Sequence, residues 1–420
     1  MSTAPAAASL VCRTVAIPDP GDLLAYLPAD GPCAWVRRGD GLVGWGETLR
    51  VRVSGRGRFR DADRAWAELT ATAAVRDDVS VPGSGPVAFA SLAFSPDSAD
   101  GGVLVVPQVL LGRRGDTCWL TTMTTGAALP ALPDLTPSDR PDSPGDVSYA
   151  DGARSGPEWM GLVRQAVERV TAGQVDKVVL ARDLVATTVD PVDPRWLLSR
   201  LAERYPSCWT FSVDGLVGAT PELLVRRERG LVTSRVLAGT IRRTGDDQRD
   251  LALAASLARS SKDLEEHEYA VRSVADALAP HCSSANVPDS PFVLHLPNVM
   301  HLATDVTGVL HDRVDAPTAI GLAEALHPTA AVCGTPTPEA NALITELEGM
   351  DRGRYSGPVG WLDASGDGEF GIALRCAQID GDDPTRLRLF AGCGIVAGSD
   401  PQAELAESQA KLVPMRDALG

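Results

Sequence analysis

The most informative stretch of this sequence is a strand that ends in glycines and leads into a helix. The alternation over residues 387–391 predicts the strand, and Gly392 and Gly394 at its end would let a ligand approach the main chain closely. Asp400 is a preferred N-cap residue and Pro401 is tolerated at the first helical position, so we expect a helix to begin at about Pro401. The pattern therefore predicts a ligand site where the strand meets the helix.

This helix would carry three charged side chains on one face. Glu404, Glu407 and Lys411 are separated by three and four residues, which puts them on the same side of a helix. Asp263 and Glu266 share a helical face in the same way. Two such helices can build a site made of oxygen ligands only, which suits Mg²⁺ rather than zinc. Either helix alone is more simply a solvated face, so the prediction depends on the two together.

Composition excludes several classes of protein. The chain has 420 residues, 44% hydrophobic and 22% charged, which is ordinary for a globular protein. The net charge of −16 argues against a nucleic-acid partner, because such binding needs a basic face. Apolar runs are shorter than the roughly 18 residues of a membrane span, and no signal peptide is evident, so we expect a cytoplasmic protein without a membrane partner. The eight scattered cysteines predict buried thiols rather than disulfides or zinc ligands.

The character of the chain changes at about residue 150. Short strands, hairpins and one helix over 61–76 are predicted before a stretch from about 129 to 156 that is rich in Pro, Ser, Asp and Gly. That stretch predicts a loop or linker, and helices alternate with strands beyond it. We expect residues 1–150 to be the N-terminal part of an α+β fold and residues 151–420 its catalytic region, within one structural domain.

Nine motifs in order resemble the chorismate-utilising enzymes, and most closely the isochorismate synthases. The resemblance covers about Glu158 to Met415 and is weak over residues 1–150. It implies an α+β fold of two large, mostly antiparallel β-sheets packed face to face, surrounded by helices, with chorismate bound between them. The motifs are VDKVVLAR, GATPELLVRR, LAGTIRR, SKDLEEHE, MHLATDVTG, LHPTAAVCGTP, DRGRYSGPVGW, ALRCAQI and AGCGIVAGSDPQAELAESQAKL.

The resemblance implies a Mg²⁺ site. Glu266 and Glu407 match the glutamates that hold the ion in this family, and Asp263 and Glu404 match positions that support it through water. Many relatives have glutamate where this chain has Asp263, so that position departs from the family pattern.

The resemblance also implies residues that bind chorismate, which has two carboxylates. A dianion needs hydrogen-bond donors and cations, and arginine can bind a carboxylate through two hydrogen bonds. His301 has an alternative interpretation, because a lone histidine on an apolar strand is as often a hydrogen-bonded core residue. The positions that match carboxylate-binding residues are Tyr355, Arg375, Gly392, Gly394 and Lys411, and those that match pocket-lining residues are Gly239, Thr240, His301 and Thr329.

The implied reaction adds water at ring carbon C2 while the C4 hydroxyl departs. Water is a poor nucleophile and hydroxide a poor leaving group, so a base and an acid are needed on opposite faces of the ring. Lys177 matches the base of the family, and Glu222 matches the acid. Burial would favour the uncharged form that each role requires. Without the other motifs, Lys177 would be an ordinary surface lysine at a strand start and Glu222 an ordinary loop carboxylate.

Three features select a reaction within the family. Anthranilate-forming relatives usually lack a lysine at position 177, and aminodeoxychorismate synthases typically have lysine where this chain has Ala238. Salicylate synthases, which also eliminate pyruvate, tend to have a polar residue in the loop where this chain has apolar residues 330–332. We therefore expect a monomeric, Mg²⁺-dependent isochorismate synthase for menaquinone or siderophore biosynthesis. The alternatives are a salicylate synthase, an anthranilate or aminodeoxychorismate synthase component, and a non-catalytic metal-binding relative.

Overall fold

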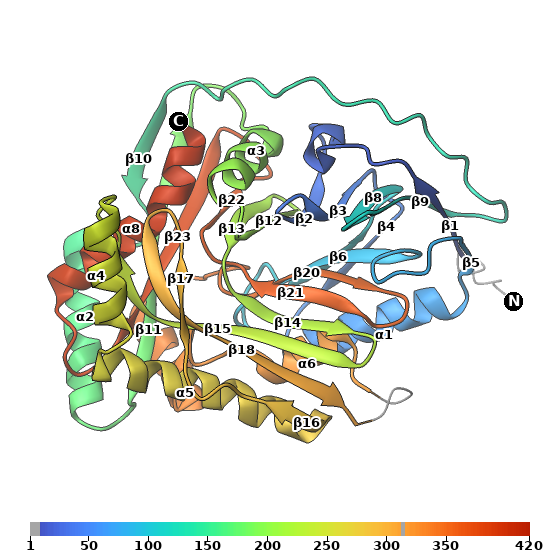
Figure 1. The fold of residues 1–420 in the computed structure, drawn as a ribbon. Coiled ribbons are helices and arrows are strands. Elements are labelled where there is room, and N and C mark those ends of the chain that lie inside the picture. The colour runs from blue at the N-terminus through green and yellow to red at the C-terminus, as the bar shows by residue number, and fades with distance from the viewer. Residues whose placement is uncertain (1–8, 312–315) are drawn as a thin grey trace, which may run out of the picture.

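Two large β-sheets packed face to face form the centre of the molecule (Figure 1). The computed structural model describes residues 9–311 and 316–420, except for the side chains of Lys262 and Glu266. One sheet has 13 strands and the other has 10. Every pair of neighbouring strands in these residues is antiparallel apart from β1 and β5. The predicted fold class, two mostly antiparallel sheets surrounded by helices, is confirmed.

The strand order in each sheet mixes distant parts of the chain. The 13-stranded sheet has the order β10 (Val147–Asp151), β11 (Lys177–Thr188), β23 (Arg386–Ile395), β22 (Cys376–Ile379), β13 (Leu216–Thr220), β12 (Trp209–Val213), β2 (Cys33–Arg37), β3 (Asp40–Trp45), β8 (Val109–Arg114), β9 (Thr117–Thr125), β1 (Leu10–Ile17) and β5 (Ala74–Asp77), with β19 (Gly334–Thr335) beside β11. The 10-stranded sheet has the order β16 (Cys282–Asn286), β18 (Val299–Leu310), β15 (Leu231–Arg242), β14 (Leu223–Glu228), β21 (Gly368–Ile372), β20 (Pro358–Asp363), β6 (Val87–Leu92), β7 (Gly102–Val106) and β4 (Leu49–Val53), with β17 (Phe292–His295) beside β18.

Helices cover the outer surfaces of the sheets (Figure 1). In the described part of the chain, none of them is long and apolar enough to cross a membrane. The helices are α1 (Arg58–Ala71), α2 (Gly156–Thr171), α3 (Pro194–Arg204), α4 (Asp247–Leu257), α5 (Ser261–Leu278), α6 (Ala319–Leu326), α7 (Thr337–Glu348) and α8 (Pro401–Leu419), with short 3₁₀ turns η1 (Leu23–Tyr26) and η2 (Ala279–His281).

Two large apolar clusters hold the layers together, and a smaller third cluster packs α4 against β18. The larger lies between the sheets and includes the fully buried rings of Phe89, Phe211 and Phe370. The second includes Leu201 of α3 and Met415 of α8, so it packs these helices onto the 13-stranded sheet. All eight cysteines are buried free thiols, as the sequence predicts.

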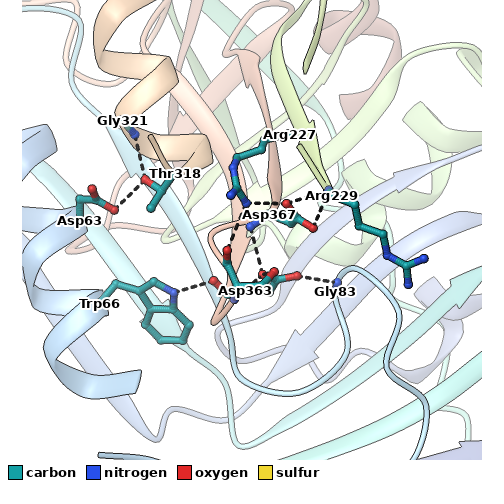
Figure 2. Close-up of polar contacts among 10 residues, drawn as sticks. Asp63, Trp66, Gly83, Arg227, Arg229, Thr318, Gly321, Asp363 and Asp367 are labelled. Carbon is teal, nitrogen blue, oxygen red and sulfur yellow. Dashed lines mark hydrogen bonds and ion pairs between the residues drawn. The ribbon is translucent and has the colours of Figure 1, made fainter. Parts of the chain in front are cut away.

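Hydrogen bonds join the N-terminal part of the chain to the hairpin of β20 and β21 (Figure 2). Trp66 on α1 donates from Nε1 to the Asp363 carbonyl at 3.0 Å, and the backbone amide of Gly83 donates to the Asp363 carboxylate at 3.1 Å. The Thr318 hydroxyl, which caps α6, donates to Asp63 of α1 at 2.7 Å. These contacts favour a single structural domain, which stays a prediction.

Three of the predicted elements differ from the structure. The helix predicted over 61–76 is α1, which ends at Ala71, and residues 74–77 form the edge strand β5 instead. The stretch from 129 to 156 was expected to be a loop, yet it contains β10 near its end. Most side chains of this edge strand are exposed, so it lacks the apolar alternation that reveals a half-buried strand. The segment before β10 does run without regular structure over the outside of the molecule (Figure 1). The predicted strand over 387–391 is longer than expected, because β23 continues through both glycines.

Candidate active site

A pocket of about 200 Å³ brings the predicted site residues together. Two predicted residues are exceptions. Thr329 is buried but does not line the pocket. Glu266 lies on α5, and its side chain is outside the described residues. The lining contains Lys177, Glu222, Gly239, Thr240, Asp263, His301, Tyr355, Arg375, Gly392, Gly394, Glu404, Glu407 and Lys411.

Helix α8 begins at Pro401 as predicted, because the Asp400 side chain accepts a hydrogen bond from the Ala403 amide at 2.8 Å. The helix packs against β23, where Lys411 donates from Nζ to the Gly392 carbonyl at 2.9 Å. Gly392 has little free space. A Cβ atom at this position would lie 3.1 Å from the Leu180 carbonyl oxygen and 3.2 Å from the Tyr355 hydroxyl. A larger residue would therefore displace groups that form the pocket wall.

Glu222 directly precedes β14 of the 10-stranded sheet and is almost completely buried. Burial raises the pKa of its carboxyl group to about 8, although the charges of Arg375, Lys177 and Lys411 act in the opposite direction. The group is therefore protonated at neutral pH. This is the ionisation state that a general acid needs.

Lys177 is the first residue of β11 and is also buried. Its strand belongs to the 13-stranded sheet and pairs with β23, where Val179 lies opposite Gly394 and Ala181 opposite Gly392. Lys177 thus enters the pocket from the 13-stranded sheet, and Glu222 enters it from the connection between β13 of that sheet and β14 of the 10-stranded sheet. An acid and a base on opposite sides of a bound ring would need such an arrangement.

A bulge in β15 brings this strand close to α5. Gly239 at the bulge has a φ of +76°, in the left-handed region that favours glycine, and a Cβ atom there would lie 3.2 Å from the Cβ atom of Asp263. The next residue, Thr240, shares a 3.0 Å hydrogen bond with Nδ1 of His301. Burial lowers the pKa of His301 well below its usual range, so this imidazole is neutral. His301 is therefore both hydrogen-bonded in the core and part of the pocket wall.

Arg375 and Tyr355 supply donors to the same pocket. Arg375 has a φ of +50°, and a non-glycine residue in this region is strained in a way that is common at functional sites. The ring of Tyr355 stacks on Phe390 with ring centroids 5.0 Å apart. Burial raises the pKa of Tyr355, so its phenol keeps the proton and can donate it in a hydrogen bond.

The acidic residues of α8 fit a hard divalent cation. Ligand atoms of Glu404, Glu407 and Cys393 lie within 4.8 Å of one another. Burial raises the pKa of Cys393, and its thiol donates to the Glu404 carbonyl at 3.4 Å, so the sulfur is an unsuitable ligand for Mg²⁺. Burial alone would raise the pKa of Glu407. The Nζ atom of Lys411 lies 2.6 Å from this carboxylate, and the neighbouring positive charges together have a larger effect than burial, so the pKa of Glu407 is lowered. Glu407 therefore offers an ionised carboxylate as a metal ligand.

Sequence reasoning assigned no role to Arg352, which also lines the pocket. This arginine lies within the motif DRGRYSGPVGW, so the signal was present in the sequence. Its contacts include the distant backbone carbonyls of Val179 and Val332, and a sequence motif does not reveal such contacts.

Comparisons with known proteins give the same family as the sequence motifs. Residues 34–420 match the family described as chorismate binding enzymes. The isochorismate synthase DhbC of Bacillus subtilis is 41% identical over 61% of this chain and 66% of its own length. The salicylate biosynthesis isochorismate synthase of Pseudomonas aeruginosa is 34% identical over 92% of this chain and 85% of its own length.

A solved structure of a relative has the same fold as this chain. MenF, the menaquinone-specific isochorismate synthase of Escherichia coli, superposes with a TM-score of 0.78 at 25% identity, over 99% of this chain and 96% of that one. The family match extends into the N-terminal part, where the motifs are weak. The chain therefore belongs to the chorismate-binding enzyme family.

Proposed function

We propose that this pocket converts chorismate into isochorismate by adding water at ring carbon C2 as the C4 hydroxyl leaves. One observation carries this proposal: buried Lys177 and protonated Glu222 line a single pocket, although they are 45 positions apart in the sequence. Isochorismate synthases among the relatives support it. A non-catalytic relative would not need to retain both groups.

The donors of the pocket would hold the two carboxylates of chorismate. Arg375 can bind a carboxylate through two parallel hydrogen bonds, and the Tyr355 phenol and the backbone amides of the lining residues Gly392 and Gly394 are the proposed further donors. Lys411 has three N–H donors, of which the Gly392 carbonyl and Glu407 each accept one. Its remaining donor is available for the substrate.

The chemistry then requires two proton transfers. Lys177 would take a proton from the attacking water, and Glu222 would give its proton to the departing hydroxyl, which leaves as water. One water molecule enters and one leaves, so the product is an isomer of the substrate. Because Lys177 lies on a strand of the 13-stranded sheet and Glu222 lies where the chain passes from that sheet to the 10-stranded sheet, we infer that they act on opposite faces of a ring bound between them.

Glu404 and Glu407 of α8 would hold Mg²⁺, and Asp263 and Glu266 of α5 are the proposed partners from the second helix. When bound, this ion would neutralise a substrate carboxylate and help to orient the ring. Asp263 lines the pocket together with the two glutamates of α8.

Glu407→Gln should weaken Mg²⁺ binding at least about tenfold, because it removes an anionic oxygen ligand. Calorimetric titration of the protein with Mg²⁺ alone measures this directly. Glu346→Gln makes the same chemical change on the exposed face of α7 and should leave the titration unaltered. An unchanged affinity in the Glu407 variant would remove this residue from the proposed site.

The proposed activity is tested by incubating the protein with chorismate and Mg²⁺ and identifying the products. We expect isochorismate to accumulate without pyruvate, because Ala331 and Val332 give the pocket an apolar wall where salicylate synthases tend to be polar. Salicylate and pyruvate without isochorismate would identify a lyase. Unconsumed chorismate would favour the non-catalytic alternative.

The pathway served by the product stays a prediction. The Escherichia coli relative is described as menaquinone-specific and the Pseudomonas aeruginosa relative by salicylate biosynthesis, so relatives of both kinds exist. We favour menaquinone biosynthesis. A cytoplasmic location and a monomeric state likewise remain proposals.

A further inference from the structure

The strand that carries Lys177 lacks a strand neighbour along part of one edge. On one side, β11 pairs with β23 over most of its length. On the other side it pairs with β19 only at Lys177 and Val178, and with β10 only from Leu184 onward. The backbone between these two short pairings must find other hydrogen-bond partners, because it is buried.

Backbone groups supply two of these partners, since the Val179 amide donates to the Cys333 carbonyl at 2.8 Å and the Gly152 amide donates to the Asp183 carbonyl at 3.2 Å. Side chains supply the partners between them. Arg352 donates from one terminal nitrogen to the Val179 carbonyl at 2.7 Å. Glu348, at the end of α7, accepts a hydrogen bond from the Ala181 amide at 2.7 Å. Trp159 of α2 donates from Nε1 to the Ala181 carbonyl at 3.1 Å. These three buried side chains therefore occupy the place of a missing strand.

Arg352 connects this strand edge to the rest of the pocket wall. Its second terminal nitrogen donates to the Val332 carbonyl at 3.0 Å and to the Ser356 hydroxyl at 3.3 Å. Its Nε atom donates to Glu348 at 2.9 Å, and the nitrogen that reaches Val179 also contacts Glu348. The five N–H donors of a guanidinium group are thus all used by protein acceptors. Arg352 lines the pocket but keeps no donor for a ligand.

We propose that the buried Glu348–Arg352 pair is a positioning device that sets the place of Lys177 relative to the bound ring. The pair fixes β11 two residues beyond Lys177, and it ties that strand to the loop at Val332, which also lines the pocket. This inference rests on the proposed role of Lys177 as the base. A base displaced by about 1 Å can lose about 10²-fold in rate, so the pair acts on catalysis without touching the substrate.

The variant Arg352→Lys distinguishes the effect of the hydrogen bonds of Arg352 from the effect of its positive charge. Lysine keeps the positive charge next to Glu348, but its single nitrogen cannot reach Val179, Val332 and Glu348 with the geometry of a guanidinium group. We expect kcat to fall about 10²-fold while KM for chorismate changes less than about threefold, because the residues proposed to bind carboxylates remain. A kcat close to that of the wild type would overturn the proposal.

Two further variants keep the test decisive. Glu348→Gln retains an oxygen acceptor for the Ala181 amide but loses the ionic partner of Arg352, so it should show the same loss of kcat. The double variant should lose little more than either single one, because both changes disable one device. Additive losses would contradict a shared role.

Trp159→Phe is the matched control for loss of stability at the same strand edge. It removes a hydrogen bond to Ala181 but leaves the bonds of Arg352 to Val179 and Val332 in place, so it should lower Tm with kcat per folded molecule within about threefold of the wild type. An equal loss of kcat in this variant would assign the effect to the strand edge in general. If the wild-type protein itself fails to convert chorismate, the proposed function fails instead.

Discussion

Replacing Lys177 with alanine should lower isochorismate formation about 10²- to 10⁴-fold while chorismate binding changes little. The size of the loss is that of a general base, and binding survives because Arg375 and the open backbone at β23 remain. Turnover is measured by the appearance of isochorismate, and binding by calorimetric titration with chorismate. Turnover near that of the wild type would rule out Lys177 as the base.

Lys177→Arg makes this prediction more specific. Arginine keeps the positive charge but cannot give up its proton in a protein, so this variant should be as inactive as the alanine variant. The chain has only three lysines, Lys177, Lys262 and Lys411, among its 39 basic residues, and two of these line the pocket. An active arginine variant would mean that position 177 contributes charge alone.

Replacing Glu222 with glutamine should abolish turnover and also stabilise the protein at alkaline pH. The pKa of Glu222 is about 8 in the folded protein against an ordinary value of 4.5, so the folded state holds this proton more tightly than the unfolded state does. Its contribution to stability is therefore complete below about pH 4.5 and is lost as the pH rises through about 8. The difference of 3.5 units corresponds to a free energy on the order of 5 kcal/mol across that window.

Glutamine does not titrate, so the variant should lack this loss of stability. Urea unfolding at pH 5 and pH 8 measures the free energy of unfolding. The free energy of unfolding of the variant should exceed that of the wild type by more at pH 8 than at pH 5. In the wild type, kcat should fall as the pH rises above about 8, because the acid then loses its proton. Glu346→Gln, on the exposed face of α7, should follow the wild type in both measurements. Parallel pH dependences of the Glu222 variant and the wild type would contradict this account.

Much of the site was predictable because its signals are local in sequence. The N-cap at Asp400 and the spacing from Glu404 to Lys411 identify α8 and its charged face without tertiary information. The motifs identify the family, and the fold follows from the family. The sequence predicts that Gly392 lets another group come close to the main chain. In the structure, the groups closest to the position of its missing Cβ atom are the Leu180 carbonyl oxygen and the Tyr355 hydroxyl.

Other features depend on contacts between distant segments. The edge strand β10 is too exposed to show an apolar alternation, so composition predicted a loop there. The Lys411–Glu407 ion pair follows from helical spacing, but the bond from Lys411 to Gly392 depends on how α8 packs against β23. Arg352 was missed because its acceptors lie as far away as Val179, a separation of 173 residues.

Conversion of chorismate in water enriched in ¹⁸O tests the central claim most directly, because it follows the oxygen that Lys177 is proposed to activate. The product should be isochorismate that carries one heavy oxygen on its ring at early times, whereas the remaining chorismate should carry none. Unlabelled isochorismate would show that the hydroxyl migrates without exchange with water, and this result would contradict the proposed roles of both Lys177 and Glu222.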